Sequence, residues 1–452
     1  MRMTVSAGGA LGSEPHGKGS SGSLTWFTFL LYLLTLTFDF RRAEGDASIF
    51  VVLMGLTNLT LGLGLILSLR SIRYSALQLA IPIMVFGVAS VIVGLLRDQT
   101  LYDVLSRSIP ILIFVVAMIV VSHFRCGDSA NTLLTMLALV SIVGVVWKVI
   151  FGFSYYGQDL SSVRYQIIAG SIPLLFAYSL TGFIVKRRRF MLLALLLTLL
   201  TITLSVTRTY LLVFFLSVVV GLVAISGYRP ARAISRALAI TAAVLSIVIV
   251  LYMFFPEVGG RWIVRLGASD RTGFDLTGET RLAEISYQVE RLSSDTLGLF
   301  FGFGQAAETR FSGVAARLVQ SILGESGVGY VGHGYGHNFY VGLIYVGGLI
   351  FGLPVIISLF RVLLVRLSFA RSRLSEMTLD DRFCLVWGLT AFAGYIGYGF
   401  LGGTFGDRAI SMNAGVAVGL MLREFGHSHR SGPPSVAPST SWLGRRGGPS
   451  HY

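Results

Sequence analysis

His337 is followed by Asn338 and then by a long apolar run, residues 339–360. The imidazole is therefore expected at the mouth of a transmembrane helix, near the lipid head groups. Histidine is the side chain best suited to accept a proton near neutral pH, which makes His337 a candidate general base. The alternative is a residue that only hydrogen-bonds locally where the helix begins.

Two arginines are candidates for binding a diphosphate. Arg208 stands in the segment SVTRT, residues 205–209, between two apolar runs, and Arg281 opens an amphipathic stretch. A guanidinium group is planar, always charged and able to bind two oxygens at once, so it suits a diphosphate at a membrane surface. The alternatives are a snorkelling arginine at a tight turn and a solvated loop charge. Further candidates for substrate binding are Arg164, Arg291 and Asn338.

Neither of two metal-like patterns predicts a metal site. His333 stands four residues before His337, a spacing that could bind a metal on a helix, but the intervening Gly-Tyr-Gly disfavours a helix. Asp380 and Asp381 form a carboxylate pair beside Arg382, and capping of the following helix is the better interpretation. We therefore expect no metal and no cofactor.

The composition predicts the elements that position these residues. Of the 452 residues 54% are hydrophobic and 13% are charged, about half the charge of an ordinary soluble domain. Apolar blocks of about 20 residues, enough to cross about 30 Å of hydrocarbon, predict an all-α transmembrane bundle of about 12 spans. The predicted spans are 24–39, 48–69, 76–96, 108–124, 131–151, 166–185, 190–206, 209–226, 237–255, 338–360, 383–402 and 405–422. A disordered protein, a disulfide scaffold and an ordinary cytosolic enzyme are excluded.

The net charge of +14 gathers in particular loops. Most basic residues fall in the even-numbered short loops and the two tails, so the positive-inside rule predicts both termini in the cytoplasm. The charge therefore indicates topology and gives no support to nucleic-acid binding.

The predicted organisation has five parts: a flexible tail 1–23, spans 24–255, an extracytoplasmic loop 256–337, spans 338–422 and a disordered tail 423–452. Two stripes predict short helices in the loop that pack onto the bundle: Leu282, Ile285, Val289 and Leu292, and then Val314, Leu318 and Ile322. No predicted span carries a central carboxylate, and ion-coupled transporters generally need one.

The order of these features resembles the O-antigen polymerase and O-antigen ligase family of bacterial membrane glycosyltransferases. The similar parts are residues 205–208, the stretch from Arg281 to Gly302-Phe303-Gly304, and His337-Asn338 leading into 347–352. The resemblance covers about residues 160–360, and the layout of spans around one large loop extends it to most of the chain. The aromatic residue that the family often has shortly after the loop arginine is not obvious here.

The resemblance implies transfer of a glycan from a polyprenyl diphosphate carrier onto a sugar hydroxyl, at the outer face of the bacterial cytoplasmic membrane. His337 would then be the general base, and Arg208 and Arg281 would stabilise the leaving diphosphate. A single displacement would invert the anomeric carbon. The implied partners are the lipid-linked oligosaccharide, a glycan acceptor, the bilayer and other polysaccharide-assembly membrane proteins.

Three functions stay open. The first is a polymerase that joins lipid-linked repeat units into a longer polysaccharide, and it is slightly preferred. The second is a ligase that moves finished glycan to a different acceptor, such as a lipid core, with the same residues. The third is a glycolipid exporter without chemistry of its own.

Overall fold

A computed structural model describes most of the chain. The described residues are 21–38, 48–69, 72–123, 128–157, 163, 167–186, 188–227, 231, 235, 239, 246, 253, 260, 262, 276–313, 316–317 and 332–425. Several predictions fall outside the described residues. They are the outer parts of both tails, the ninth span except residues 239, 246 and 253, Arg164, and the second apolar stripe of the loop.

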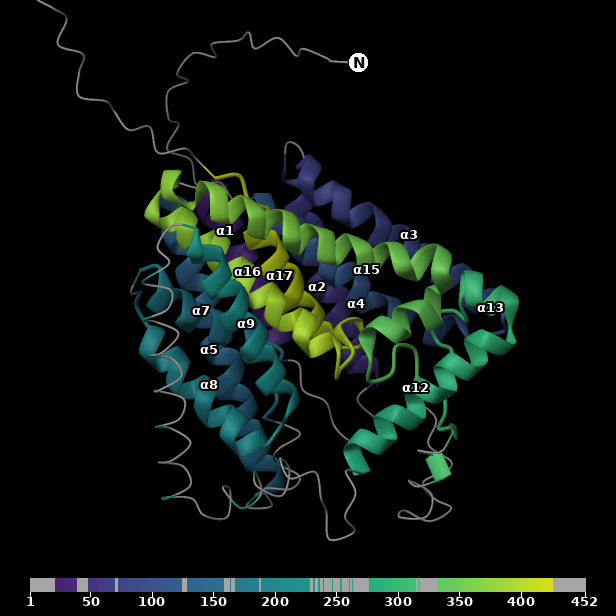
Figure 1. Cartoon of the computed structure of the whole chain (residues 1–452). Coiled ribbons are helices and arrows are strands. Elements are labelled where there is room, and N and C mark those ends of the chain that lie inside the picture. The colour runs from purple at the N-terminus through teal and green to yellow at the C-terminus, as the bar shows by residue number, and fades with distance from the viewer. Residues whose placement is uncertain are drawn as a thin grey trace, which may run out of the picture.

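The described chain is all-α, apart from two antiparallel strands of two residues, β1 (Glu308–Thr309) and β2 (Gly332–His333). Figure 1 shows the helices as one tilted bundle, with α12 and α13 beside it. The bundle helices are α1 (Ser21–Thr37), α2 (Ser48–Leu67), α3 (Tyr74–Leu96), α4 (Leu101–His123), α5 (Asp128–Tyr156), α7 (Ile172–Ile184), α8 (Met191–Ser205), α9 (Thr209–Ser226), α15 (Phe339–Arg373), α16 (Leu379–Gly399) and α17 (Arg408–Leu422). The loop helices are α12 (Leu276–Ser294) and α13 (Thr296–Phe301).

Every predicted span outside 237–255 coincides with one of these helices, so the all-helical prediction is confirmed. Five helical stretches are long and apolar enough to cross a membrane: Tyr74–Leu96, Leu101–His123, Asn131–Tyr155, Thr209–Ser226 and Phe339–Glu376. Shorter apolar stretches lie in α1, α2, α7, α8 and α17: Leu24–Thr37, Val52–Leu67, Ile172–Ile184, Met191–Ser205 and Arg408–Leu422. The architecture is thus compatible with a membrane protein.

Helix α16 lies at the centre of the bundle, packed against α7, α9 and α17. Nearly every side chain after its first turn is buried. Trp387 fills this core and donates its indole N–H to the Leu174 carbonyl at 2.8 Å, which satisfies its one polar group. A Cβ atom at Gly388 would lie 2.6 Å from the Met421 nitrogen, so glycine lets α17 approach closely. Such small residues are typical of helix interfaces in membranes.

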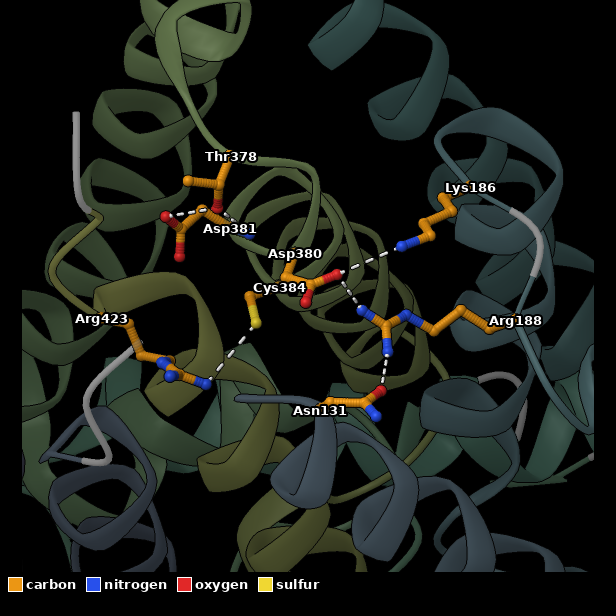
Figure 2. Close-up of polar contacts among 8 residues, drawn as sticks. All are labelled: Asn131, Lys186, Arg188, Thr378, Asp380, Asp381, Cys384 and Arg423. Atoms are coloured by element: carbon orange, nitrogen blue, oxygen red, sulfur yellow. Dashed lines mark hydrogen bonds and ion pairs between the residues drawn. The ribbon is translucent and has the colours of Figure 1, made fainter. Parts of the chain in front are cut away.

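Polar contacts tie neighbouring segments to both ends of α16. At its C-terminal end, Asn338 donates from Nδ2 to the Phe400 carbonyl at 3.2 Å. At its N-terminal end, Arg188 donates to Asp380 and to the Asn131 side chain, and so joins α5 and α7 to α16 (Figure 2).

The carboxylate pair at the start of α16 lies in its first turn, directly after the N-cap. Thr378 is the N-cap, and its hydroxyl accepts from the Asp381 N–H at 3.2 Å and donates to the Asp381 carboxylate at 2.8 Å. Asp380 pairs with Arg188 and with Lys186, the latter at 3.7 Å (Figure 2). The N-cap is therefore Thr378, which Asp381 supports, whereas Asp380 joins α16 to the loop after α7.

Helix α15 differs from the predicted span 338–360 in two ways. Its backbone leaves the helical conformation at Gly348, where φ is 66° and ψ is −174°. It also continues to Arg373, so arginines predicted in a loop after residue 360 belong to the helix. The prediction was wrong there because hydropathy marks where an apolar run ends, whereas residues 361–373 contain no glycine or proline to end the helix.

The break at Gly348 is filled by the segment that follows α13. The backbone N–H of Phe303 donates to the Tyr345 carbonyl at 2.9 Å, and that of Gly304 donates to the Val346 carbonyl at 3.0 Å. Carbonyls just before a helix break need partners from elsewhere, and this segment supplies them. The motif Gly302-Phe303-Gly304 and the glycine-containing segment 347–352 thus meet in one contact.

Gly302→Ala is expected to lower the free energy of unfolding by about 2–5 kcal/mol. Gly302 has φ of +82°, and an added Cβ would lie 2.2 Å from the Val346 carbonyl oxygen, a backbone atom that cannot move aside. Thermal unfolding of the purified protein in detergent measures the effect. Gly64→Ala is the matched control, because nothing lies within 4 Å of its added Cβ and alanine favours the helix. Equal melting temperatures for the two variants would contradict the prediction.

Candidate functional site

His337 is held by a buried carboxylate from the loop helix α12. Oε2 of Glu284 lies 2.7 Å from the imidazole Nδ1 and accepts the His337 backbone N–H at 2.9 Å. The Glu284 side chain is 3% exposed, whereas the His337 side chain is 52% exposed. The carboxylate therefore fixes the ring from inside the protein, while the ring itself reaches the surface.

Two glycines shape the turn that brings His337 to this position. Gly334 and Gly336 have φ of 77° and 64°, in the region that favours glycine. A Cβ at Gly336 would lie 2.9 Å from Cδ of Glu284, so a larger residue would collide with the carboxylate. The predicted interruption of the helix is confirmed, and His333 lies on β2. Among the described residues no three His, Cys, Asp or Glu side chains are grouped to hold a metal ion.

This pair has the form of a carboxylate-assisted base. With the carboxylate against Nδ1, the neutral ring carries its proton there and leaves Nε2 as the acceptor. The same carboxylate stabilises the imidazolium that forms when Nε2 takes a proton. His337 can therefore remove a proton from a hydroxyl group that approaches the exposed edge of the ring.

Asn338 has a structural role. Its Oδ1 accepts the N–H groups of Tyr340 at 3.1 Å and Val341 at 3.0 Å, which makes it the N-cap of α15. Its Nδ2 reaches the Phe400 carbonyl and ties the start of α15 to the end of α16. Local hydrogen bonding at the helix start, weighed above for His337, is thus performed by its neighbour. Substrate binding by Asn338 stays a prediction.

Arg281 lies on the same face of α12 as Glu284. The two residues are three positions apart on α12, which places their Cβ atoms about 5–6 Å from each other. The Arg281 side chain is partly buried, and its Nε atom is inaccessible to solvent. The role of Arg281 in binding a diphosphate stays a prediction.

Arg208 lies at the sharp turn between α8 and α9. Val206 has φ of 48°, an uncommon conformation for a β-branched residue. Two residues after Arg208, the ring of Tyr210 lies 6.5 Å from that of Tyr398, near the end of α16. Since Phe400 contacts Asn338 at the same end, the Arg208 turn and the His337 turn adjoin the last turn of one helix. Its role in binding diphosphate stays a prediction.

Arg291 forms part of a cluster that holds α12 and α13 in place. It donates to the Tyr287 hydroxyl at 2.7 Å, and its guanidinium carbon lies 4.7 Å from the centre of the Phe303 ring. The guanidinium of Arg97 lies 4.4 Å from the same ring and donates to Asp295 at 3.0 Å. The Gly298 N–H, and then Arg97, hold the pKa of Asp295 below its ordinary value. Arg291 thus braces the loop, and its contact with substrate stays a prediction.

The face of α12 that packs onto the protein differs from the predicted apolar stripe. Leu292 is buried as predicted, but Leu282 and Val289 are exposed, and Glu284 and Gln288 are buried instead. The prediction was wrong at these positions because hydrophobic periodicity assumes that the inward face of a helix is apolar. The buried face of α12 instead carries the polar residue Glu284, whose partner is His337.

Glu284 is a candidate functional residue that the sequence did not indicate. One signal was present: Arg281, Glu284 and Gln288 recur at spacings of three and four, which places them on one helix face. A polar stripe on a loop helix ordinarily indicates a solvated face, so this pattern alone does not indicate a site.

Comparison with models of known protein families and with curated proteins finds no match to the chain. Among the predicted site residues, the structure places His337 in contact with Glu284, and Arg281 lies three positions before Glu284 on α12.

Proposed function

We propose that the chain is a bacterial membrane glycosyltransferase that moves a polyprenyl-diphosphate-linked glycan onto a sugar hydroxyl, as the resemblance to O-antigen polymerases and ligases implies. The observation that carries the proposal is the contact of 2.7 Å between buried Glu284 and exposed His337. A sugar hydroxyl is a poor nucleophile at neutral pH, so its transfer needs a base of this kind.

The proposal places the protein in the inner membrane with about 12 spans, with the loop 256–337 on the outer face and both termini in the cytoplasm. Five long apolar helices support the embedding, and the excess of basic residues in the even-numbered loops supports the orientation. In this orientation His337, Arg281 and Arg208 lie on the outer side, where a lipid-linked glycan is presented.

The proposed reaction is one displacement. Nε2 of His337 takes the proton of the acceptor hydroxyl, and its oxygen attacks the anomeric carbon of the donor. The bond from that carbon to the diphosphate oxygen breaks, and the lipid diphosphate leaves with the bonding electrons. Arg208 and Arg281 would stabilise the negative charge that develops on it. Attack opposite the leaving group inverts the anomeric carbon.

Polymerisation of lipid-linked repeat units is the specific form that we propose. The test combines purified protein in liposomes with a defined polyprenyl diphosphate oligosaccharide, and analyses the products on a gel. A ladder of chain lengths on the carrier supports a polymerase. Product on a second acceptor alone would make the protein a ligase. Glycolipid that crosses the bilayer without any new glycosidic bond would overturn the enzyme and indicate an exporter.

A further inference from the structure

Helix α13 exposes large apolar side chains. Leu297 is 67% exposed and Phe300 is 45% exposed, and Phe301 beside them is exposed as well. Figure 1 shows α13 at the edge of the molecule, next to the end of α3 and to α15, which it approaches at the break at Gly348. Exposed apolar groups clustered on one short helix indicate a surface that binds something.

Helix α13 is held to the bundle by contacts on both of its sides, although its apolar side chains are exposed. Arg97 at the end of α3 pairs with Asp295 at 3.0 Å, directly before α13. Gln99 donates to the Phe303 carbonyl at 2.7 Å, directly after it. Polar groups on both sides of the helix are thus used for attachment to the bundle, and the apolar groups face away from it.

The apolar surface of α13 continues onto two bundle helices. The ring of Phe301 lies 6.4 Å from that of Phe351 on α15, and the neighbouring Ile350 of α15 is exposed. On the other side, Leu95 and Leu96 are exposed at the end of α3. Both α3 and α15 are long and apolar enough to cross a membrane, so whatever covers their outer faces extends to α13.

Helix α12, like α13, turns large apolar side chains away from the bundle. It turns Glu284 and Gln288 into the protein and leaves Leu282 and Val289 exposed. Packing that buries polar groups and exposes apolar ones is unfavourable in water, but it suits a helix whose outer side contacts lipid.

We propose that α13, together with Leu282 and Val289 of α12, is a lipid-binding surface that lies in the interfacial layer of the bilayer. Leucine and aromatic side chains are favoured at that depth, and the charged pair Arg97–Asp295 can reach the head groups. The surface would hold Glu284 and His337 at the level of the lipid diphosphate. The inference goes beyond the proposed function and rests only on its membrane placement.

Spin labels on single cysteines test the proposal in the full chain, reconstituted in liposomes with Cys126 and Cys384 replaced by serine. Collision rates are measured with oxygen, which concentrates in the bilayer, and with a water-soluble nickel chelate. Labels at Leu297→Cys and Phe300→Cys are expected to favour oxygen several-fold more than a label at Ser293→Cys, an exposed polar position on α12. Phe215→Cys on α9, where the native side chain is 63% exposed, serves as the control for lipid contact.

Three results would overturn the lipid surface, and they can be told apart. If Leu297 and Phe300 match Ser293 while Phe215 favours oxygen, α13 lies in water and the proposed enzyme is unaffected. If both reagents are excluded from the α13 labels, another protein or a second copy covers the helix. If Phe215 also favours the chelate, the membrane placement fails, and the proposed function fails with it.

Discussion

His337→Ala is expected to reduce glycan transfer by about 10²- to 10⁴-fold, the usual contribution of a positioned general base. The His337 side chain is half exposed, whereas Glu284, which contacts its Nδ1, is buried. Because the His337 side chain is half exposed, its removal leaves little cavity, and the backbone N–H that bonds to Glu284 remains. We therefore expect the melting temperature to change little.

The measurement is the initial rate of product formation with a defined lipid-linked donor, alongside thermal unfolding of the same preparation. His337→Gln separates hydrogen bonding from proton transfer, since an amide fills the site but accepts no proton near neutral pH; it is expected to be as inactive as alanine. Tyr102→Ala, at an exposed position on α4, is the matched control and should keep the normal rate. Normal transfer by either His337 variant would disprove the mechanism.

Glu284→Gln is expected to lower kcat by about 10²- to 10⁴-fold with little change in KM. Glutamine has nearly the shape of glutamate, so α12 should remain packed. It lacks the negative charge that stabilises the protonated ring, and its amide can turn an N–H toward Nδ1, which favours the wrong tautomer. A change confined to kcat is the sign of a group that acts on the reacting base and leaves substrate binding intact.

Glu290→Gln is the matched control, because it removes the same charge from an exposed position on the same helix. It should leave both kinetic constants unchanged. Glu284→Asp, which keeps the charge but shortens the side chain, should retain more activity than Glu284→Gln. If Glu284→Gln works at the normal rate, or if it lowers the melting temperature and the rate together while Glu284→Asp does the same, the carboxylate only holds the loop in place.

The sequence by itself determined the helical architecture and one half of the site. Apolar runs of about 20 residues specify helices because such runs must satisfy their backbone groups internally in lipid, and this is a local property. His337 was found for a similar reason, since its chemistry and its place before an apolar run are both read within one short segment.

The tertiary structure alone decided which residues meet. Glu284 reaches His337 across 53 positions of sequence, and the glycines after α13 enter the break at Gly348. Hydropathy carries no information on such pairings, because it records how apolar a segment is and not which partner its polar groups find. The inward face of α12 can be polar because the buried Glu284 has a partner, His337, which comes from a turn distant in sequence.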